Sequence, residues 1–239
     1  MAVISFRGSI PPLTNATRVT MAMPDLLPAD GGLWKVIWIL GDEGKQSDWI
    51  ARKTDMEALS RRTGCMTVMT EGLHSDYENM VRGLRWYDYV TDGLPRYIRS
   101  IFPVSDKSED NFVFGYGMGG LGAFRIAMRD PDFAAAYGCC SADFDIFAED
   151  SVHSGPEYEH RMKTIYGDDL RSAEVLERCD PFTMAEKAVT VPKMLICGDA
   201  SAQRIAGTLS EKNSESSFMP LTGENALEES LRAFESFTR

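Results

Sequence analysis

Short apolar runs alternate with amphipathic segments along most of the chain. Six runs are short and apolar enough to be buried strands, at residues 19–23, 34–40, 66–69, 111–114, 134–140 and 193–197. Four other segments carry apolar residues three and four positions apart, as one face of a helix does, at residues 48–63, 87–101, 121–129 and 225–237. This alternation predicts an α/β fold with a mainly parallel, twisted sheet flanked by helices.

The stretch 143–190 interrupts this pattern, because its first part, up to residue 178, is polar and acidic with little periodicity. No repeat and no linker composition divides the chain, so we expect a single domain over residues 1–239. Within it, 143–190 is predicted to be an excursion over the carboxyl edge of the sheet, where α/β folds bind their ligands.

The charge balance narrows the classes of partner. The chain has 25 Lys and Arg against 36 Asp and Glu, a formal net charge of −11. Nucleic acid is therefore not an expected partner, since phosphate backbones are bound mainly by Lys and Arg. No apolar run reaches the roughly 18 residues of a membrane span and residues 1–9 lack a signal-peptide pattern, so we expect a cytoplasmic protein without membrane attachment.

The five cysteines are odd in number and lie mostly in apolar surroundings, which suits buried thiols in a reducing compartment. Their spacing matches no metal site, and neither a metal nor a cofactor is expected. Cys139 and Cys140 are neighbours on a predicted strand, where successive side chains point to opposite faces. We therefore interpret them as two packed thiols and not as a redox pair.

A strand, a glycine-rich turn and a helix are predicted in direct succession at residues 111–129, NFVFGYGMGGLGAFRIAMR. This is the context of a nucleophile elbow, in which a G-x-S-x-G motif makes a sharp turn and exposes its serine. Gly115 and Gly119 occupy the flanking positions, and Gly117 occupies the central one.

The segment resembles the Gly-x-Ser-Met-Gly-Gly-x-Gly-Ala elbow of a bacterial esterase family, the esterase D and tributyrin esterase group of α/β-hydrolases. Other segments are similar to that family in the same order, covering nearly the whole chain: WILGDEGKQSDW at 38–49, TEGLHSDY at 70–77, LPRYIRSIFP at 94–103, PDFAAA at 131–136 and PKMLICG at 192–198. The resemblance implies an α/β-hydrolase fold and a carboxylesterase ancestry. It also implies a homo-oligomer.

The departures from the family fall on the catalytic groups. A serine hydrolase needs a hydroxyl nucleophile, an imidazole base and a carboxylate, in the chain order serine, acid, histidine. Gly117 has no side chain, and the last histidine of the chain is His160. The family's acid position maps near Ser201, with Asp199 as a displaced substitute.

The base and the oxyanion loop are altered as well. Where the family has a Gly-His pair before its final helix, this chain has Glu224 and Asn225, neither of which acts as imidazole does near neutral pH. Leu40 replaces the family's loop histidine, and Asp42 lies beside Gly41, where a carboxylate would repel a developing oxyanion. These changes together predict a natural pseudoenzyme.

The predicted elbow keeps the exposed N–H groups of a helix amino terminus, which favour small anions. We expect a pocket that binds a small polar or acyl-bearing ligand without transforming it, although Asp42, Glu43 and Asp199 oppose an anion there. The predicted lining consists of Gly41, Asp42, His74, Tyr77, Tyr116, Gly117 and Met118.

Three alternatives stay open at this point. A hydrolase with a non-standard site would use His74 or Tyr77 to act on a water. A dinucleotide-binding protein would use Gly115-x-Gly117-x-x-Gly120, with Asp143 near the position of a ribose-binding acid. A third class is an assembly role, in which the domain serves as a subunit of an oligomer.

Overall fold

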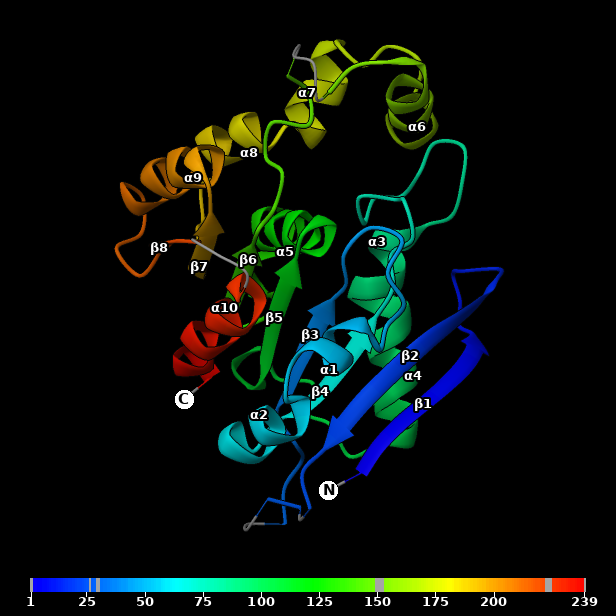
Figure 1. Ribbon diagram of the computed structural model, residues 1–239, viewed down its shortest axis with the longest axis vertical. Helices are drawn as coiled ribbons and strands as arrows, with labels where there is room; N and C mark the ends of the chain where they lie inside the picture. The colour runs from blue at the N-terminus through cyan, green and yellow to red at the C-terminus, as the bar shows by residue number, and fades with distance from the viewer. Residues whose placement is uncertain (1, 26, 29–30, 149–152, 222–224, 239) are drawn as a thin grey trace.

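The computed structural model describes residues 2–25, 27–28, 31–148, 153–221 and 225–238 (Figure 1). The strands in these residues form an eight-stranded sheet of order β1-β2-β4-β3-β5-β6-β7-β8. Their bounds are β1 Ala2–Ser9, β2 Ala16–Met23, β3 Val36–Leu40, β4 Met66–Thr70, β5 Asn111–Tyr116, β6 Ala136–Cys140, β7 Lys193–Gly198 and β8 Ser217–Pro220. β1, β2 and β4 pair antiparallel, and the pairs from β4 through β8 are parallel. The predicted mainly parallel sheet is confirmed.

The six predicted strands correspond to β2 through β7, with shifted ends. The pattern missed β1 and β8, which are the two edge strands. Neither has a fully buried residue, so neither shows the continuous apolar run that marks an inner strand, although half-buried and exposed positions alternate along most of β1. Inner strands such as β3, β4 and β6 are buried at every position, because helices cover both faces of the sheet.

The described helices are α1 Trp49–Lys53, α2 Met56–Thr63, α3 Trp86–Asp88, α4 Leu94–Ile101, α5 Met118–Arg129, α6 Pro156–Tyr166, α7 Ala173–Cys179, α8 Pro181–Lys187, α9 Ala200–Ser210 and α10 Ala226–Glu235. The single helix predicted over 48–63 is wrong. Thr54 is extended, and the Asp55 carboxylate accepts a hydrogen bond from the Ala58 N–H, so a new helix begins there. The segment predicted over 87–101 is helical, with a π-helical turn at Tyr89–Gly93 between α3 and α4.

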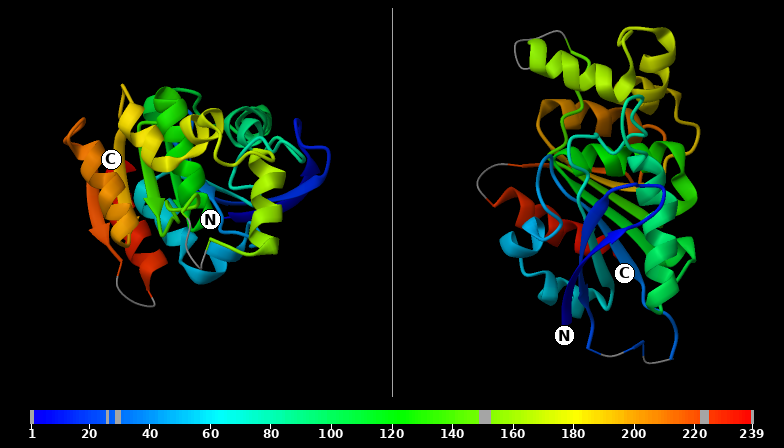
Figure 2. Two further views of the ribbon diagram at one scale, coloured as in Figure 1. Left: turned by 90° about the horizontal axis from the view of Figure 1, so that it is seen from above. Right: turned by 90° about the vertical axis from the view of Figure 1, so that its right-hand side faces the viewer.

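Two apolar clusters pack on the two faces of the sheet. On one face, Ile50 of α1, Leu59 of α2 and Phe234 of α10 pack against strand residues. On the other face, the cluster includes Phe124 of α5 and Ile205 of α9 together with residues of α3, α4 and the α6–α8 region. Figure 2 shows the sheet edge-on between these helical layers. The five cysteines are all buried and unpaired, and this includes Cys139 and Cys140.

The stretch between β6 and β7 contains three helices that the sequence pattern did not predict, α6, α7 and α8. Figure 1 places α6 and α7 beyond the carboxyl ends of the parallel strands. Most positions of α6 and α7 are exposed or half-buried, which explains the weak apolar periodicity of this stretch. The few buried positions, such as Met162 and Val175, face the rest of the protein. These helices roof the edge of the sheet at which the elbow lies.

Candidate functional site

The elbow forms as predicted, with Gly117 between the end of β5 and the start of α5. Gly117 has φ +60° and ψ −126°, a conformation that residues with a side chain adopt only under strain. Its N–H donates to the carbonyl of Cys140 at 2.9 Å. Gly119 makes the second close approach, since a Cβ there would lie 2.0 Å from the carbonyl oxygen of Leu40. The turn is therefore pressed against the loop that follows β3.

Asp42 extends from that loop onto the beginning of α5. Its Oδ1 accepts hydrogen bonds from the N–H of Met118 at 3.0 Å and from the N–H of Glu43 at 2.7 Å. In α/β-hydrolases, an oxyanion hole is made by the N–H after the elbow residue and by an N–H of the loop after β3. Both kinds of donor are present here, and they converge on an oxygen of the protein itself.

Asp42 also fills the space next to the elbow residue. A Cβ atom on Gly117 would lie 2.0 Å from Oδ1 of Asp42, which is much closer than two non-bonded atoms can approach. The Asp42 carboxylate is half-buried, and it lies where a side chain at position 117 would begin. The present position of Asp42 therefore requires glycine at the elbow.

A cavity of about 420 Å³ opens beside the elbow. Its walls come from the loop after β3, the loop after β4, the elbow with the start of α5, the segment after β6 and helix α6. The lining residues are Asp42, Glu43, Asp76, Tyr116, Gly117, Met118, Leu121, Ser141, Asp143, Ile146, Tyr158 and Arg161. Carboxylates, two tyrosine rings and one arginine dominate this surface.

Four of the seven predicted lining residues, Asp42, Tyr116, Gly117 and Met118, line this cavity. The other three lie beside it. Gly41 is buried, and its N–H donates to the carbonyl of Thr70. The His74 side chain is 67% exposed, and its Nδ1 lies 2.9 Å from Oε1 of Glu43. Tyr77 is fully buried and donates its hydroxyl hydrogen to the carbonyl of Gly41 at 3.1 Å, so it supports the loop from below.

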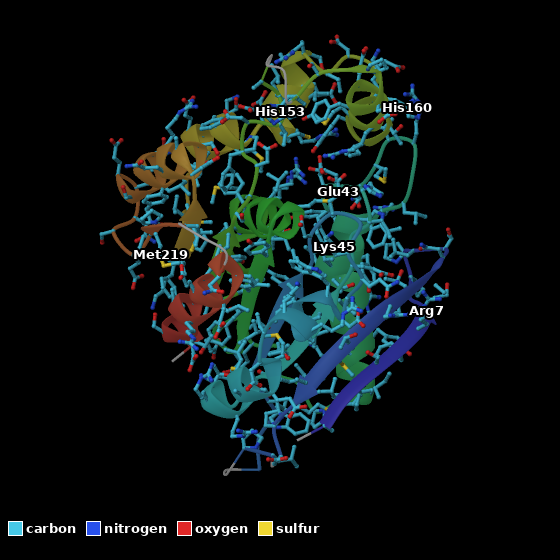
Figure 3. The ribbon with its side chains drawn as sticks, viewed as in Figure 1. Arg7, Glu43, Lys45, His153, His160 and Met219 are labelled. Atoms are coloured by element: carbon cyan, nitrogen blue, oxygen red, sulfur yellow. The ribbon has the colours of Figure 1, made fainter. Side chains whose placement is uncertain are left out.

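Arg161 joins α6 to both loops of the cavity. Its Nη1 donates to Oε1 of Glu43 at 2.6 Å, and its Nη2 donates to Oδ1 of the buried Asp76 at 2.8 Å. The Tyr166 hydroxyl of the same helix donates to Oδ2 of Asp76 at 2.8 Å. Burial lowers the pKa of the Arg161 guanidinium, but the charges of Asp76 and Glu43 raise it above its ordinary value. Figure 3 shows Glu43 beneath α6, which carries His160, and the loop before it, which carries His153.

Arg125 lies under this network and was not singled out from the sequence. Its side chain is fully buried, and it donates to the carbonyl of Asp76 and to the Tyr166 hydroxyl. Its Nε lies 3.2 Å from Oε1 of Glu78. One signal was available, because Arg125 falls within a stretch of α5 whose neighbours are all apolar or glycine. A charged residue in such a stretch indicates a buried ion pair.

The predicted acid position, Asp199, caps helix α9. Its Oδ1 accepts hydrogen bonds from the Ser201 N–H at 2.9 Å, the Ser201 hydroxyl at 2.7 Å and the Ala202 N–H at 3.3 Å. The hydrogen bond from the Ser201 side chain is the main cause that holds the pKa of Asp199 below its ordinary value. Neither Asp199 nor Ser201 is among the residues that line the elbow cavity.

Neither Asn225 nor any described histidine is among the residues that line the elbow cavity. Asn225 is exposed at the start of α10, and Glu224 lies outside the described residues. His160 lies on α6 and is not among the residues that line the cavity. His153 Nε2 lies 2.7 Å from Oδ2 of Asp143. In the part of the chain that the structure describes, no histidine lines the elbow cavity.

The dinucleotide alternative gains no support from this geometry. In a dinucleotide-binding fold, the N–H groups at the start of the helix bind the pyrophosphate. Here the Met118 N–H already binds the Asp42 carboxylate. Asp143, the candidate ribose-binding acid, is paired with His153.

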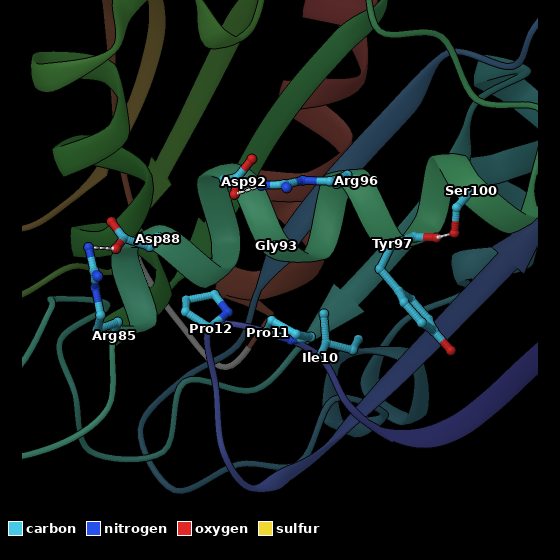
Figure 4. Close-up of a pocket in the computed structure, with 10 residues that line it drawn as sticks. All are labelled: Ile10, Pro11, Pro12, Arg85, Asp88, Asp92, Gly93, Arg96, Tyr97 and Ser100. Carbon is cyan, nitrogen blue, oxygen red and sulfur yellow. Dashed lines mark hydrogen bonds and ion pairs between the residues drawn. The ribbon is translucent and has the colours of Figure 1, made fainter.

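A larger cavity of about 690 Å³ runs along α3 and α4, next to the turn between β1 and β2 (Figure 4). Two of its arginines are paired with acidic neighbours on the same helical segment, Arg85 with Asp88 and Arg96 with Asp92. None of the elbow residues lines it. We therefore place the candidate site at the elbow.

Among the residues whose structure is described, no group of three or more His, Cys, Asp or Glu side chains could hold a metal ion. None of the described helices combines the length and the apolar character that a bilayer crossing requires.

Comparison with known proteins supports the esterase resemblance. No model of a known protein family matches the chain. An acetyl esterase of Caldicellulosiruptor saccharolyticus is 29% identical over 97 residues, which are 40% of this chain and 36% of that esterase. The chain thus matches just over a third of the length of this relative.

Solved structures match over the whole chain. The fluorophosphonate-binding serine hydrolase F (FphF) of Staphylococcus aureus superposes with a TM-score of 0.82 at 24% identity, covering 100% of this chain and 98% of its own. The S-formylglutathione hydrolase FrmB of Staphylococcus aureus gives 0.79 at 25% identity, covering 99% and 97%. The S-formylglutathione hydrolase of Agrobacterium tumefaciens gives 0.74 at 18%, covering 98% and 92%. The protein has the α/β-hydrolase fold, and it is a homologue of esterase-family α/β-hydrolases.

Proposed function

We propose that this protein is a non-catalytic esterase homologue that binds a small polar molecule in the elbow cavity without transforming it. The observation that carries this proposal is the position of Asp42. Its Oδ1 lies on the Met118 and Glu43 N–H groups, beside an elbow residue that has no side chain.

Acyl transfer through a serine needs two things at this place. It needs a hydroxyl at the elbow to attack the carbonyl, and it needs free N–H donors to stabilise the oxyanion that forms. Gly117 supplies no hydroxyl. The two N–H donors are bonded to a carboxylate, whose negative charge would repel a developing oxyanion at that distance. Both requirements fail at the same point.

The missing base supports the same conclusion. A serine hydroxyl is a weak nucleophile until an imidazole takes its proton. The described lining of the cavity contains no histidine, and Asn225 is exposed at the start of α10. A variant that restored the serine alone would therefore still lack the base and free oxyanion donors.

The proposal is tested with an activated fluorophosphonate probe and with p-nitrophenyl acetate. We expect no covalent adduct by intact-protein mass spectrometry and no hydrolysis above that of buffer and of heat-denatured protein. A catalytically active serine hydrolase treated in parallel verifies the probe. Stoichiometric labelling, or turnover well above both controls, would overturn the proposal.

One observation favours a second candidate, ester hydrolysis through a non-standard group. Ser141 lines the cavity, and its φ of +54° is a strained conformation for a residue with a side chain. The Asp143 and His153 pair follows it in the chain. If the native protein hydrolyses esters, the variants Ser141→Ala and His153→Ala should abolish that activity under this alternative. Activity that both variants retain would exclude it.

A further inference from the structure

The Asp42 carboxylate occupies the position at which an anionic ligand would bind the elbow N–H groups. The N–H groups of Met118 and Glu43 point at one oxygen atom, at 3.0 Å and 2.7 Å. These distances agree with those of donors that stabilise an oxyanion, about 2.7–3.1 Å. One donor begins α5, and the other is the N–H of the residue directly after Asp42 in the loop that follows β3, so the carboxylate lies between its own loop and the helix. The site is therefore built for an anion and is occupied by one.

The surroundings explain why the occupant is held. Helix α5 spans Met118–Arg129, and the aligned peptide dipoles of a helix give its amino terminus a partial positive charge. The absent side chain of Gly117 leaves the room that the Asp42 carboxylate takes. An anionic ligand could bind the two N–H groups only after Asp42 had left them.

The terminal nitrogens of the one arginine in the cavity are already paired with carboxylates of the protein. Its Nη1 and Nη2 atoms are bonded to Glu43 and Asp76, so both of its terminal nitrogens are engaged by carboxylates. A ligand carboxylate would therefore find the N–H pair occupied and the guanidinium paired. It would also approach the negative charge of Asp42 itself.

We propose that Asp42 fills an otherwise complete anion site, and that this one side chain decides the charge class of the ligand. Carboxylates and esters are excluded, and the cavity takes a molecule that presents an ammonium group or other hydrogen-bond donors. The lining carries four carboxylates against one arginine, which suits such a ligand, and the Tyr116 ring adds an aromatic face that attracts cations. The Tyr158 ring already carries the Arg161 guanidinium. This inference rests on the proposed function, because it assigns a ligand class to the same cavity.

The test uses two four-carbon probes of opposite charge, butyrate and butylamine, at neutral pH. Binding is followed through the amide signals of ¹⁵N-labelled protein, where Met118 and Glu43 report on the N–H pair. For the native protein, we expect butylamine to shift signals of cavity residues and butyrate to leave Met118 and Glu43 unchanged.

Two variants separate the charge of Asp42 from its shape. Asp42→Ala empties the anion site, so butyrate should bind at least about tenfold more tightly than to the native protein, with shifts at Met118 and Glu43. Asp42→Asn keeps an oxygen that accepts both N–H bonds and removes only the charge. It should therefore lose the preference for butylamine without gaining the butyrate site. Circular dichroism and thermal melting show that each variant is folded.

The possible results distinguish the inference from the proposed function. Butyrate binding at Met118 and Glu43 of the native protein would overturn the inference, even if no ester is hydrolysed. Failure of a folded Asp42→Ala variant to gain butyrate binding would also overturn it, and so would a native protein whose cavity signals butylamine does not shift. Ester turnover by the native protein would instead overturn the proposed function.

Discussion

Asp42 and Gly117 are mutually dependent, because a Cβ atom at position 117 would lie 2.0 Å from Oδ1 of Asp42. The two residues are distant in the chain, yet the absence of one side chain makes room for the other. This relationship leads to the first two predictions.

Gly117→Ser should lower stability and should not create an esterase. The new side chain meets Asp42 and must also adopt a φ near +60°, which together should cost roughly 1–3 kcal/mol of unfolding free energy. The hydroxyl would have no imidazole beside it. Urea denaturation and p-nitrophenyl acetate hydrolysis measure the two effects. Efficient turnover by this single variant would reveal a base that the described cavity does not contain.

A double-mutant cycle should detect the coupling directly. In an Asp42→Ala background, Gly117→Ser no longer meets the carboxylate, so its destabilising effect should shrink by about 1 kcal/mol. The backbone strain at position 117 remains in both backgrounds and cancels in the comparison. Strictly additive changes in unfolding free energy would contradict the steric relationship.

Asp199 should act as a helix cap and not as part of the cavity. Asp199→Ala removes the acceptor of three hydrogen bonds at the start of α9 and should cost about 1 kcal/mol. Binding of butylamine should stay unchanged. Asp145→Ala is the matched control. Asp145 forms a solvent-accessible ion pair with Arg204 at 3.6 Å, and such a pair should contribute little to the free energy of unfolding. A change in ligand binding without a change in stability would assign Asp199 to the site.

Arg161 should hold α6 over the cavity. Arg161→Met leaves Asp76, which is 1% exposed, without one of its two side-chain partners and should cost roughly 1–3 kcal/mol. Amide hydrogen exchange across Pro156–Tyr166 should accelerate. Lys163→Met on the same helix is the control, because Lys163 forms only a solvent-accessible pair with Glu159. Equal rates of amide hydrogen exchange in both variants would show that the Arg161 ion pairs do not hold α6 in place.

Glu78 should give the protein an acid-sensitive stability. Burial alone raises the pKa of Glu78, but the guanidinium groups of Arg125 and Arg129 outweigh it and hold the pKa below its ordinary value. This stabilisation is present above the ordinary value of about 4.3 and is lost as the pH falls through the lower value of the folded protein. Glu78→Gln should therefore destabilise the protein at neutral pH by about 3 kcal/mol.

Urea denaturation at several pH values checks the Glu78 prediction. The difference in unfolding free energy between the native protein and Glu78→Gln should narrow as the pH is lowered below about 4.3. The variant keeps the size of the side chain and removes only its charge. A difference that stays constant over this range would mean that the Glu78 charge does not stabilise the fold.

The sequence pattern was sufficient to predict those strands that are buried on both faces. Strands β3, β4 and β6 are buried on both faces, so every position had to be apolar or small and the runs were recognisable. The edge strands β1 and β8 and the helices of the roof satisfy mixed demands, because each is partly exposed. β1 alternates half-buried and exposed positions without an apolar run, and the pattern of β8 and of the roof helices is weak. The break at Thr54 was missed because a local cap at Asp55 competes with a longer helical pattern.

The sequence by itself determined the elbow at Gly117, because a sharp turn between a strand and a helix depends on nearby glycines. The resemblance to esterases also brought Asp42 to the neighbourhood of that turn. Only the tertiary structure decided what Asp42 does there. Leu40 pairs with Gly115 across adjacent parallel strands, so the residues that follow each strand emerge at the same edge of the sheet. Packing at that edge directs the Asp42 carboxylate onto the Met118 N–H, 76 positions further along the chain, which no local pattern encodes.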